Sequence, residues 1–107
     1  MNTKIKKIIN LFKEQIEEHY KDRLSNMVLF GSQARNDAEE GSDINILIVL
    51  NDEEVNVVQE IRKIGDLITS LSLEFDEVIS CVFMSKKRYL NEKSPLLLNI
   101  RKEGIVL

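Results

Sequence analysis

The sequence has one cysteine, one proline and no tryptophan among its 107 residues. The single cysteine, Cys81, excludes an internal disulfide framework and a cysteine-based zinc site, and it fits a reducing compartment. The longest uninterrupted apolar run, residues 46–50, is far too short to span a bilayer. The basic start also lacks the apolar stretch and the cleavage site of a signal peptide. These absences predict a small soluble protein of the cytoplasm that makes no membrane contact.

Net positive charge is missing as well. The chain has 18 acidic residues against 15 lysines and arginines, a formal net charge of −3. Proteins that bind nucleic acid directly need clustered positive charge against the phosphates, so we expect no such contact. Hydrophobic residues make up 43% of the chain, which is enough for an ordinary core. The length predicts a single domain over residues 1–107.

Apolar periodicity divides the chain into helices and strands. Three-to-four-residue spacing and capping residues predict helices over 3–22 (with Thr3 as the N-cap), 53–71 and 95–103, and short helices at 32–38 and 86–90. Short apolar runs predict strands at 27–30, 44–50 and 78–84. We expect the apolar end, residues 105–107, to be either a last core strand or an exposed docking surface. The order predicts an α/β (α+β) fold with a small mixed sheet flanked by helices.

A glycine and a serine end the first predicted strand, and ten residues separate them from the aspartate that opens the second. Gly31 lets the backbone approach a phosphate closely, N–H groups at the start of a short helix can donate to it, and the Ser32 hydroxyl adds a donor. Arg35, within one turn, can place a fixed positive charge on a triphosphate. The pattern predicts a phosphate-binding turn formed by Gly31, Ser32 and Arg35.

Two polar residues, Asp43 and Asn45, begin the second strand. Strand side chains alternate between faces, so Asp43, Asn45 and Leu47 share one face. Residues two apart on a strand lie roughly 6.5–7 Å apart, close enough to bracket a divalent metal ion. Magnesium typically takes one or two carboxylates together with substrate phosphates. A Gly-Ser turn or an Asp-x-Asn start is common by itself, but the two at this spacing predict a triphosphate site with its metal at Asp43 and Asn45.

The segment Gly31-Ser32-x10-Asp43-x-Asn45 resembles the signature of the polymerase-β-like nucleotidyltransferase superfamily, specifically its minimal nucleotidyltransferase branch. The resemblance covers nearly the whole chain. It implies a nucleotidyltransferase fold and transfer of AMP from ATP, with Mg²⁺, onto a hydroxyl group with release of pyrophosphate. By position, Gly31 and Ser32 would hold the triphosphate and Asp43 would ligate magnesium.

The chain departs from the family pattern at two positions. Asn45 stands where the family has its second metal-binding aspartate, which leaves three outcomes open: one bound metal, nucleotide binding without turnover, or slow catalysis. The family often adds a third carboxylate on the next strand, where Asp76, Glu77 and Ser80 are the candidates. We choose Asp76 as the group that takes the proton of the acceptor.

The size of the chain also bears on its partners, because 107 residues leave no second lobe to hold an acceptor. In the minimal branch many members are antitoxins paired with a small helical HEPN-type toxin, and some add AMP to that partner. The resemblance therefore implies a protein-modifying antitoxin. The alternative is a catalytically inactive protein of the same fold that neutralises a partner by contact alone.

Overall fold

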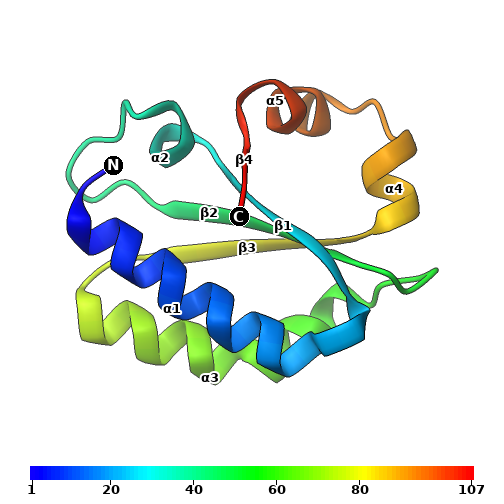
Figure 1. Ribbon diagram of the computed structural model, residues 1–107, viewed down its shortest axis with the longest axis horizontal. Coiled ribbons are helices and arrows are strands. Elements are labelled where there is room, and N and C mark those ends of the chain that lie inside the picture. Colours follow the sequence, from blue (N-terminus) through cyan, green and yellow to red (C-terminus); the bar gives the residue numbers. More distant parts are fainter.

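Four strands form one mixed sheet in the order β3-β2-β1-β4 in the computed structural model, which describes residues 1–107 (Figure 1). Their bounds are Leu24–Phe30 for β1, Ile44–Leu50 for β2, Ile79–Ser85 for β3 and Ile105–Val106 for β4. β1 runs antiparallel to β2 and to β4, whereas β2 and β3 are parallel. The mixed sheet predicted from the sequence is confirmed.

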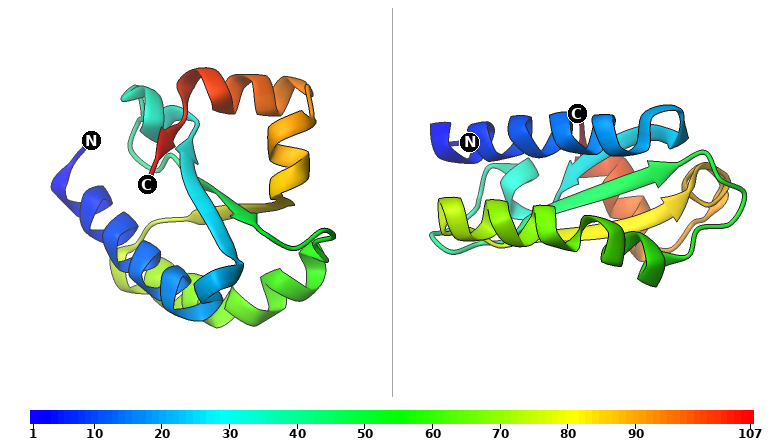
Figure 2. Two further views of the ribbon diagram at one scale, coloured as in Figure 1. Left: turned by 45° about the vertical axis from the view of Figure 1, so that its right-hand side comes forward. Right: turned by 90° about the horizontal axis from the view of Figure 1, so that it is seen from below.

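Helices cover both faces of the sheet (Figure 2). The long helices α1 (Thr3–Tyr20) and α3 (Val57–Phe75) lie on one face. The short helices α4 (Lys86–Asn91) and α5 (Pro95–Glu103) lie on the other, beside α2 (Ser32–Arg35). A 3₁₀ turn, Lys21–Arg23, links α1 to β1. None of the helices combines the length and the apolar character that crossing a membrane requires.

The alternation of strand side chains creates two separate apolar clusters. Ile44, Ile46 and Ile48 of β2 belong to the larger cluster, which packs against α1 and α3. Leu47 and Val49 belong to a smaller cluster beneath α5. Asn45 is two residues before Leu47, so its side chain lies on the same face of β2. The α5 helix covers that face farther along the strand. The predicted alternation is confirmed within β2, whereas Asp43 precedes the first residue of the strand, so its place on this face stays a prediction.

One predicted helix cap and one predicted helix start are wrong, and in each case an asparagine side chain is the reason. Asn2, not Thr3, caps α1, because its Oδ1 accepts a hydrogen bond from the Ile5 N–H at 2.8 Å. The second long helix starts at Val57 rather than at residue 53, because Asn56 Oδ1 accepts from the Gln59 N–H at 3.1 Å. An N-cap satisfies a backbone donor that the helix leaves free, which fixes the first turn.

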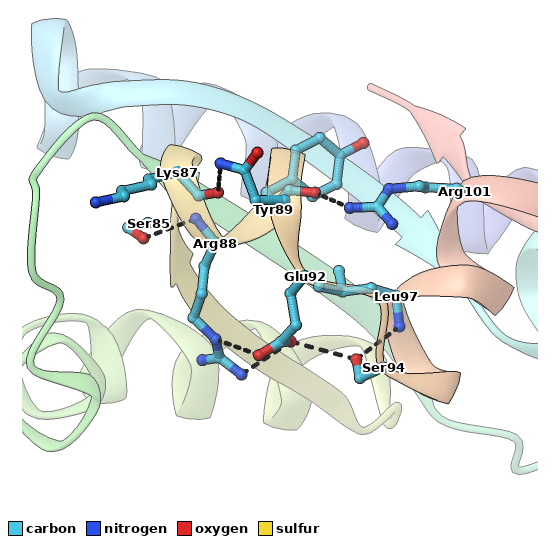
Figure 3. A network of polar contacts seen from close by, with 9 residues as sticks. Ser85, Lys87, Arg88, Tyr89, Glu92, Ser94, Leu97 and Arg101 are labelled. Atoms are coloured by element: carbon cyan, nitrogen blue, oxygen red, sulfur yellow. Dashed lines mark hydrogen bonds and ion pairs between the residues drawn. The ribbon is translucent and has the colours of Figure 1, made fainter.

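The pair α4–α5 is held by serine caps and an ion pair (Figure 3). Ser85 Oγ accepts from the Arg88 N–H at 3.1 Å, and Ser94 Oγ accepts from the Leu97 N–H at 3.3 Å, so a serine side chain caps each of the two helices. Ser94 Oγ also donates to Glu92 Oε2 at 3.2 Å, and Glu92 pairs with Arg88 at 3.0 Å. These contacts fix the turn that connects α4 to α5.

The apolar end of the chain forms the edge of the sheet. Val106 pairs with Val28 of β1, and the Leu107 N–H donates to the Met27 carbonyl at 2.9 Å. The side chains of Ile105 and Val106 are nevertheless 44% and 66% exposed. The backbone therefore behaves as a last strand, whereas these two side chains stay outside the core.

Candidate functional site

The predicted phosphate turn and the predicted metal position meet at one end of the sheet. Phe30, the last residue of β1, pairs with Asn45 of β2. Gly31 follows directly, and a β-carbon placed on it would lie only 2.8 Å from Asn45 Nδ2. Side chains from two strands and one turn therefore share a small volume, and only glycine leaves room for the Asn45 amide.

The backbone at Gly31 has a conformation that favours glycine for a second reason. Its φ of 79° with ψ of −157° lies in a region that other residues rarely occupy. In this conformation its carbonyl accepts the N–H groups of Ala34 and Arg35, both at 3.1 Å, which starts α2. No side chain caps this start. The first N–H groups of a helix lack partners within it, so those of Ser32 and Gln33 can donate to a phosphate.

The loop that delivers Asp43 is held by Gln33 and Ser42. Ser42 Oγ accepts from the Glu39 N–H at 3.0 Å, and Gly41 turns the chain with φ 83°. The buried Gln33 side chain donates to the Ser42 carbonyl at 3.5 Å, which ties α2 to the loop. Sequence reasoning missed Gln33 because an amide within a four-residue helix carries no periodic signal. The one sequence feature that marks Gln33 is its position directly after Gly31 and Ser32.

Asp43 itself is exposed and forms no ion pair. The next residue, Ile44, donates its N–H to the Val78 carbonyl at 2.8 Å, which fixes the start of β2. Asn45, one position further, is half-buried beside Gly31. The site thus offers one free carboxylate at its entrance and one amide group inside.

The third strand places a serine, not a carboxylate, next to Asn45. Ser80 of β3 is the register partner of Asn45, and neighbouring strands lie about 4.8 Å apart. Asp76 lies outside the strand. It ends α3 in a left-handed conformation with φ 53° and lines a cavity of about 270 Å³ together with Gly41. The structure brings Gly31 and Asn45 together, leaves Asp43 exposed directly before β2, and sets Asp76 beside the loop that precedes Asp43.

Arg35 is occupied by carboxylates of this chain. Its Nε donates to Asp37 Oδ2 at 3.1 Å, and its Nη1 donates to Glu103 Oε2 of α5 at 3.2 Å. The hydrogen bond to Asp37, followed by the one to Glu103, raises the pKa of Arg35 above its usual range. The guanidinium keeps its charge, but a triphosphate has to compete for it.

Comparison with known proteins identifies the family. A sequence model described as a nucleotidyltransferase domain matches residues 9–105. A protein of Methanocaldococcus jannaschii named for protein adenylyltransferase activity is 38% identical over 79 residues, 74% of this chain and 78% of that protein. The chain belongs to the nucleotidyltransferase domain family. The resemblance predicted from the Gly31 to Asn45 segment is confirmed.

Two further similarities cover more of the chain. A second nucleotidyltransferase relative from M. jannaschii, with the same kind of name, is 36% identical over 103 residues, 94% of this chain and 95% of that protein. A solved toxin–antitoxin structure with AMP-PNP superposes at a TM-score of 0.59 and 19% identity, over 88% of this chain and 68% of that one. At that identity the likeness shows the nucleotidyltransferase fold.

The donor set at this nucleotidyltransferase site fits a single magnesium ion. No three histidine, cysteine, aspartate or glutamate side chains cluster in the chain. Asp43 would supply a carboxylate and Asn45 an amide oxygen, and substrate phosphates and water would supply the remaining ligands. The loop before them also carries Asp37, Glu39 and Glu40, so a polyanion meets strong negative charge here. A bound cation would offset that repulsion, which favours nucleotide binding as a metal complex.

Proposed function

We propose that this protein transfers AMP from ATP to a hydroxyl group of a partner protein, as the antitoxin of a toxin–antitoxin pair in the cytoplasm. The partner we propose is a small helical HEPN-type protein. One observation carries the proposal: Gly31 and Asn45 are in contact at the end of the sheet where Asp43 is free. The names of the two M. jannaschii relatives support the adenylyl chemistry, and the toxin–antitoxin likeness supports a protein partner.

In this proposal the residues at the end of β1 bind the triphosphate. The Ser32 hydroxyl and the N–H groups of Ser32 and Gln33 would donate to the phosphates, and Arg35 would neutralise part of their charge. Asp43 and Asn45 would hold the magnesium ion, which when bound screens the phosphate charge and polarises the α-phosphate. Gln33, through Ser42, would keep Asp43 at the correct distance from the turn.

The reaction is a displacement at the α-phosphorus. The acceptor oxygen forms a bond to that phosphorus while the bond to the bridging oxygen of the β-phosphate breaks, and pyrophosphate leaves. We assign Asp76 as the general base: its carboxylate, exposed beside Gly41, would accept the proton of the acceptor hydroxyl. A tyrosine, serine or threonine of the partner supplies the hydroxyl.

A second candidate function is supported by the residues beside Gly31. Asn45 and its neighbour Ser80 are both neutral, so the interior of the site lacks the two negative charges that carboxylates would supply there. A protein with this site can bind nucleotide, or only its partner, without transferring AMP. The candidate is then an inactive antitoxin that neutralises its partner by contact.

Intact-mass analysis distinguishes the two functions. The chain is co-expressed with the proposed partner, a small helical protein from a neighbouring gene if one is found there, and the two are co-purified and incubated with ATP and Mg²⁺. A mass gain of one AMP on the partner is the expected result. A stable complex without mass gain would leave the contact-only function, and the absence of a complex would contradict both.

Two variants of one loop provide the control. Asp43→Ala removes the free carboxylate of the site and should abolish the mass gain. Glu40→Ala removes an exposed acid three residues away and should preserve it. If the two variants behave alike, the loss reflects the charge of the loop rather than a role of Asp43.

A further inference from the structure

A narrow crevice connects the phosphate turn to α5. It has a volume of about 130 Å³ and is lined by Phe30, Gly31, Arg35, Leu96, Asn99, Ile100 and Glu103. α2 and α5 lie next to each other above the sheet, although they are far apart in the sequence (Figure 1). The helix α5 therefore forms one wall of a crevice that the phosphate turn also lines.

The one charged contact across this crevice joins Arg35 to Glu103 at 3.2 Å. The Arg35 side chain is 42% exposed and that of Glu103 33% exposed, so water reaches the pair. Such solvent-exposed pairs contribute little stability. The pair is consequently easy to exchange for another anion, and its removal should leave the fold intact.

A carboxylate at the position of Glu103 is unfavourable within α5 itself, and its favourable partner is Arg35. Glu103 is the last residue of the helix, where the helix dipole disfavours a carboxylate. The two residues before it, Arg101 and Lys102, have the charge that this helix end prefers. The helix is also fixed in place, since Arg101 donates to the Tyr89 carbonyl and Ser94 caps its start (Figure 3). A fixed α5 holds the Glu103 carboxylate against Arg35.

We propose that Glu103 is a positioning residue that occupies the Arg35 guanidinium in the nucleotide-free protein and is displaced when a triphosphate binds. This inference rests on the proposed nucleotide site and adds a competitor to it. While the site is empty, Glu103 shares the charge of Arg35 with Asp37, and the Glu103 carboxylate repels the phosphates that replace it. Glu103 therefore weakens nucleotide binding, and it weakens the binding of the most highly charged nucleotide the most.

The test is a titration of the full chain with Mg·ATP, Mg·ADP and AMP at low ionic strength. Glu103→Gln removes the charge and keeps the size of the side chain. We expect Glu103→Gln to bind Mg·ATP about twofold to fivefold more tightly, the range that an exposed ion pair permits. The gain should shrink from Mg·ATP to Mg·ADP to AMP, and it should fall as salt screens the charges.

Two further variants make the test specific. Glu14→Gln removes an exposed glutamate of α1 and should leave all three affinities unchanged. In an Arg35→Ala background, Glu103→Gln should have a smaller effect, because the carboxylate no longer competes for the guanidinium. Equal Mg·ATP affinity in the wild type and Glu103→Gln, or an equal gain for all three nucleotides, would overturn the inference.

The outcomes also separate this inference from the proposed function. Tighter binding in Glu103→Gln without transfer of AMP supports the role of Glu103 and contradicts the transferase. Transfer of AMP with no change on Glu103→Gln contradicts the role of Glu103 and leaves the transferase standing. If neither protein binds Mg·ATP, the nucleotide site itself is wrong and both fail.

Discussion

Replacing Gly31 with alanine tests the geometry of the site through stability. Two costs arise at this position. A side chain at φ 79° and ψ −157° is strained, and its β-carbon would lie 2.8 Å from Asn45 Nδ2. The strain costs about 1–3 kcal/mol. Moving the Asn45 amide away from its preferred rotamer adds about 0.5–1.5 kcal/mol.

Two other glycines of the same chain separate these costs. Gly41 has φ 83°, but a β-carbon placed there would meet no atom within 4 Å, so Gly41→Ala should cost the strain alone, about 1–2 kcal/mol. Gly65 lies within α3 with neither strain nor contact, so Gly65→Ala should stabilise by about 0.5–1 kcal/mol. From the most stable to the least stable, the expected order is Gly65→Ala, wild type, Gly41→Ala and Gly31→Ala.

Thermal and urea unfolding measure these differences, and a melting temperature moves by roughly 4–8 °C per kcal/mol in a domain of this size. Combining Gly31→Ala with Asn45→Ala isolates the contact, since removing the amide should recover about 0.5–1.5 kcal/mol of rotamer cost. If Gly31→Ala costs no more than Gly41→Ala, or if Asn45→Ala recovers nothing, Gly31 and Asn45 are not in contact and the site has been described wrongly.

Three further predictions concern single side chains. Asn45→Asp should tighten Mg·ATP binding in calorimetry because it restores a second carboxylate, and equal affinity would exclude a metal role for this position. Ser32→Ala should weaken nucleotide binding by about 1.5–3 kcal/mol with little change in melting temperature, whereas a drop in stability alone would make Ser32 a structural residue. Burial raises the pKa of the Cys81 thiol to about 12, so alkylation at about pH 8 should be slow in the folded protein and fast in urea. Rapid alkylation of the folded protein would contradict the burial. The unfolded thiol loses its proton at a lower pH than the folded one, so Cys81 should also lower the free energy of unfolding as the pH rises past about 9.

Local sequence patterns predicted most of the fold correctly. Periodic apolar residues indicated both long helices, and alternation correctly divided the side chains of β2 between the two faces of the sheet. The cap of α1 and the start of α3 were wrong because the choice between neighbouring capping residues depends on side-chain hydrogen bonds. Asn2 and Asn56 make those bonds, and no periodicity reveals them.

The parts of the site that sequence could not predict depend on contacts between distant residues. Arg35 and Glu103 are 68 positions apart, so their pairing follows only from the packing of α5 beside α2. The residue beside Asn45 is likewise set by the register of β2 against β3. That register places Ser80 next to Asn45, whereas Asp76 falls in the turn before the strand.

The central claim is that Gly31, Asp43 and Asn45 form a metal-dependent ATP site. Isothermal titration of the full chain with ATP, in the presence and absence of Mg²⁺, tests it most directly. We expect binding only with Mg²⁺, and loss of that binding in Asp43→Ala without a change in melting temperature, because Asp43 is exposed and forms no ion pair in the chain. ATP binding that needs no metal, or that survives Asp43→Ala unchanged, would contradict the claim.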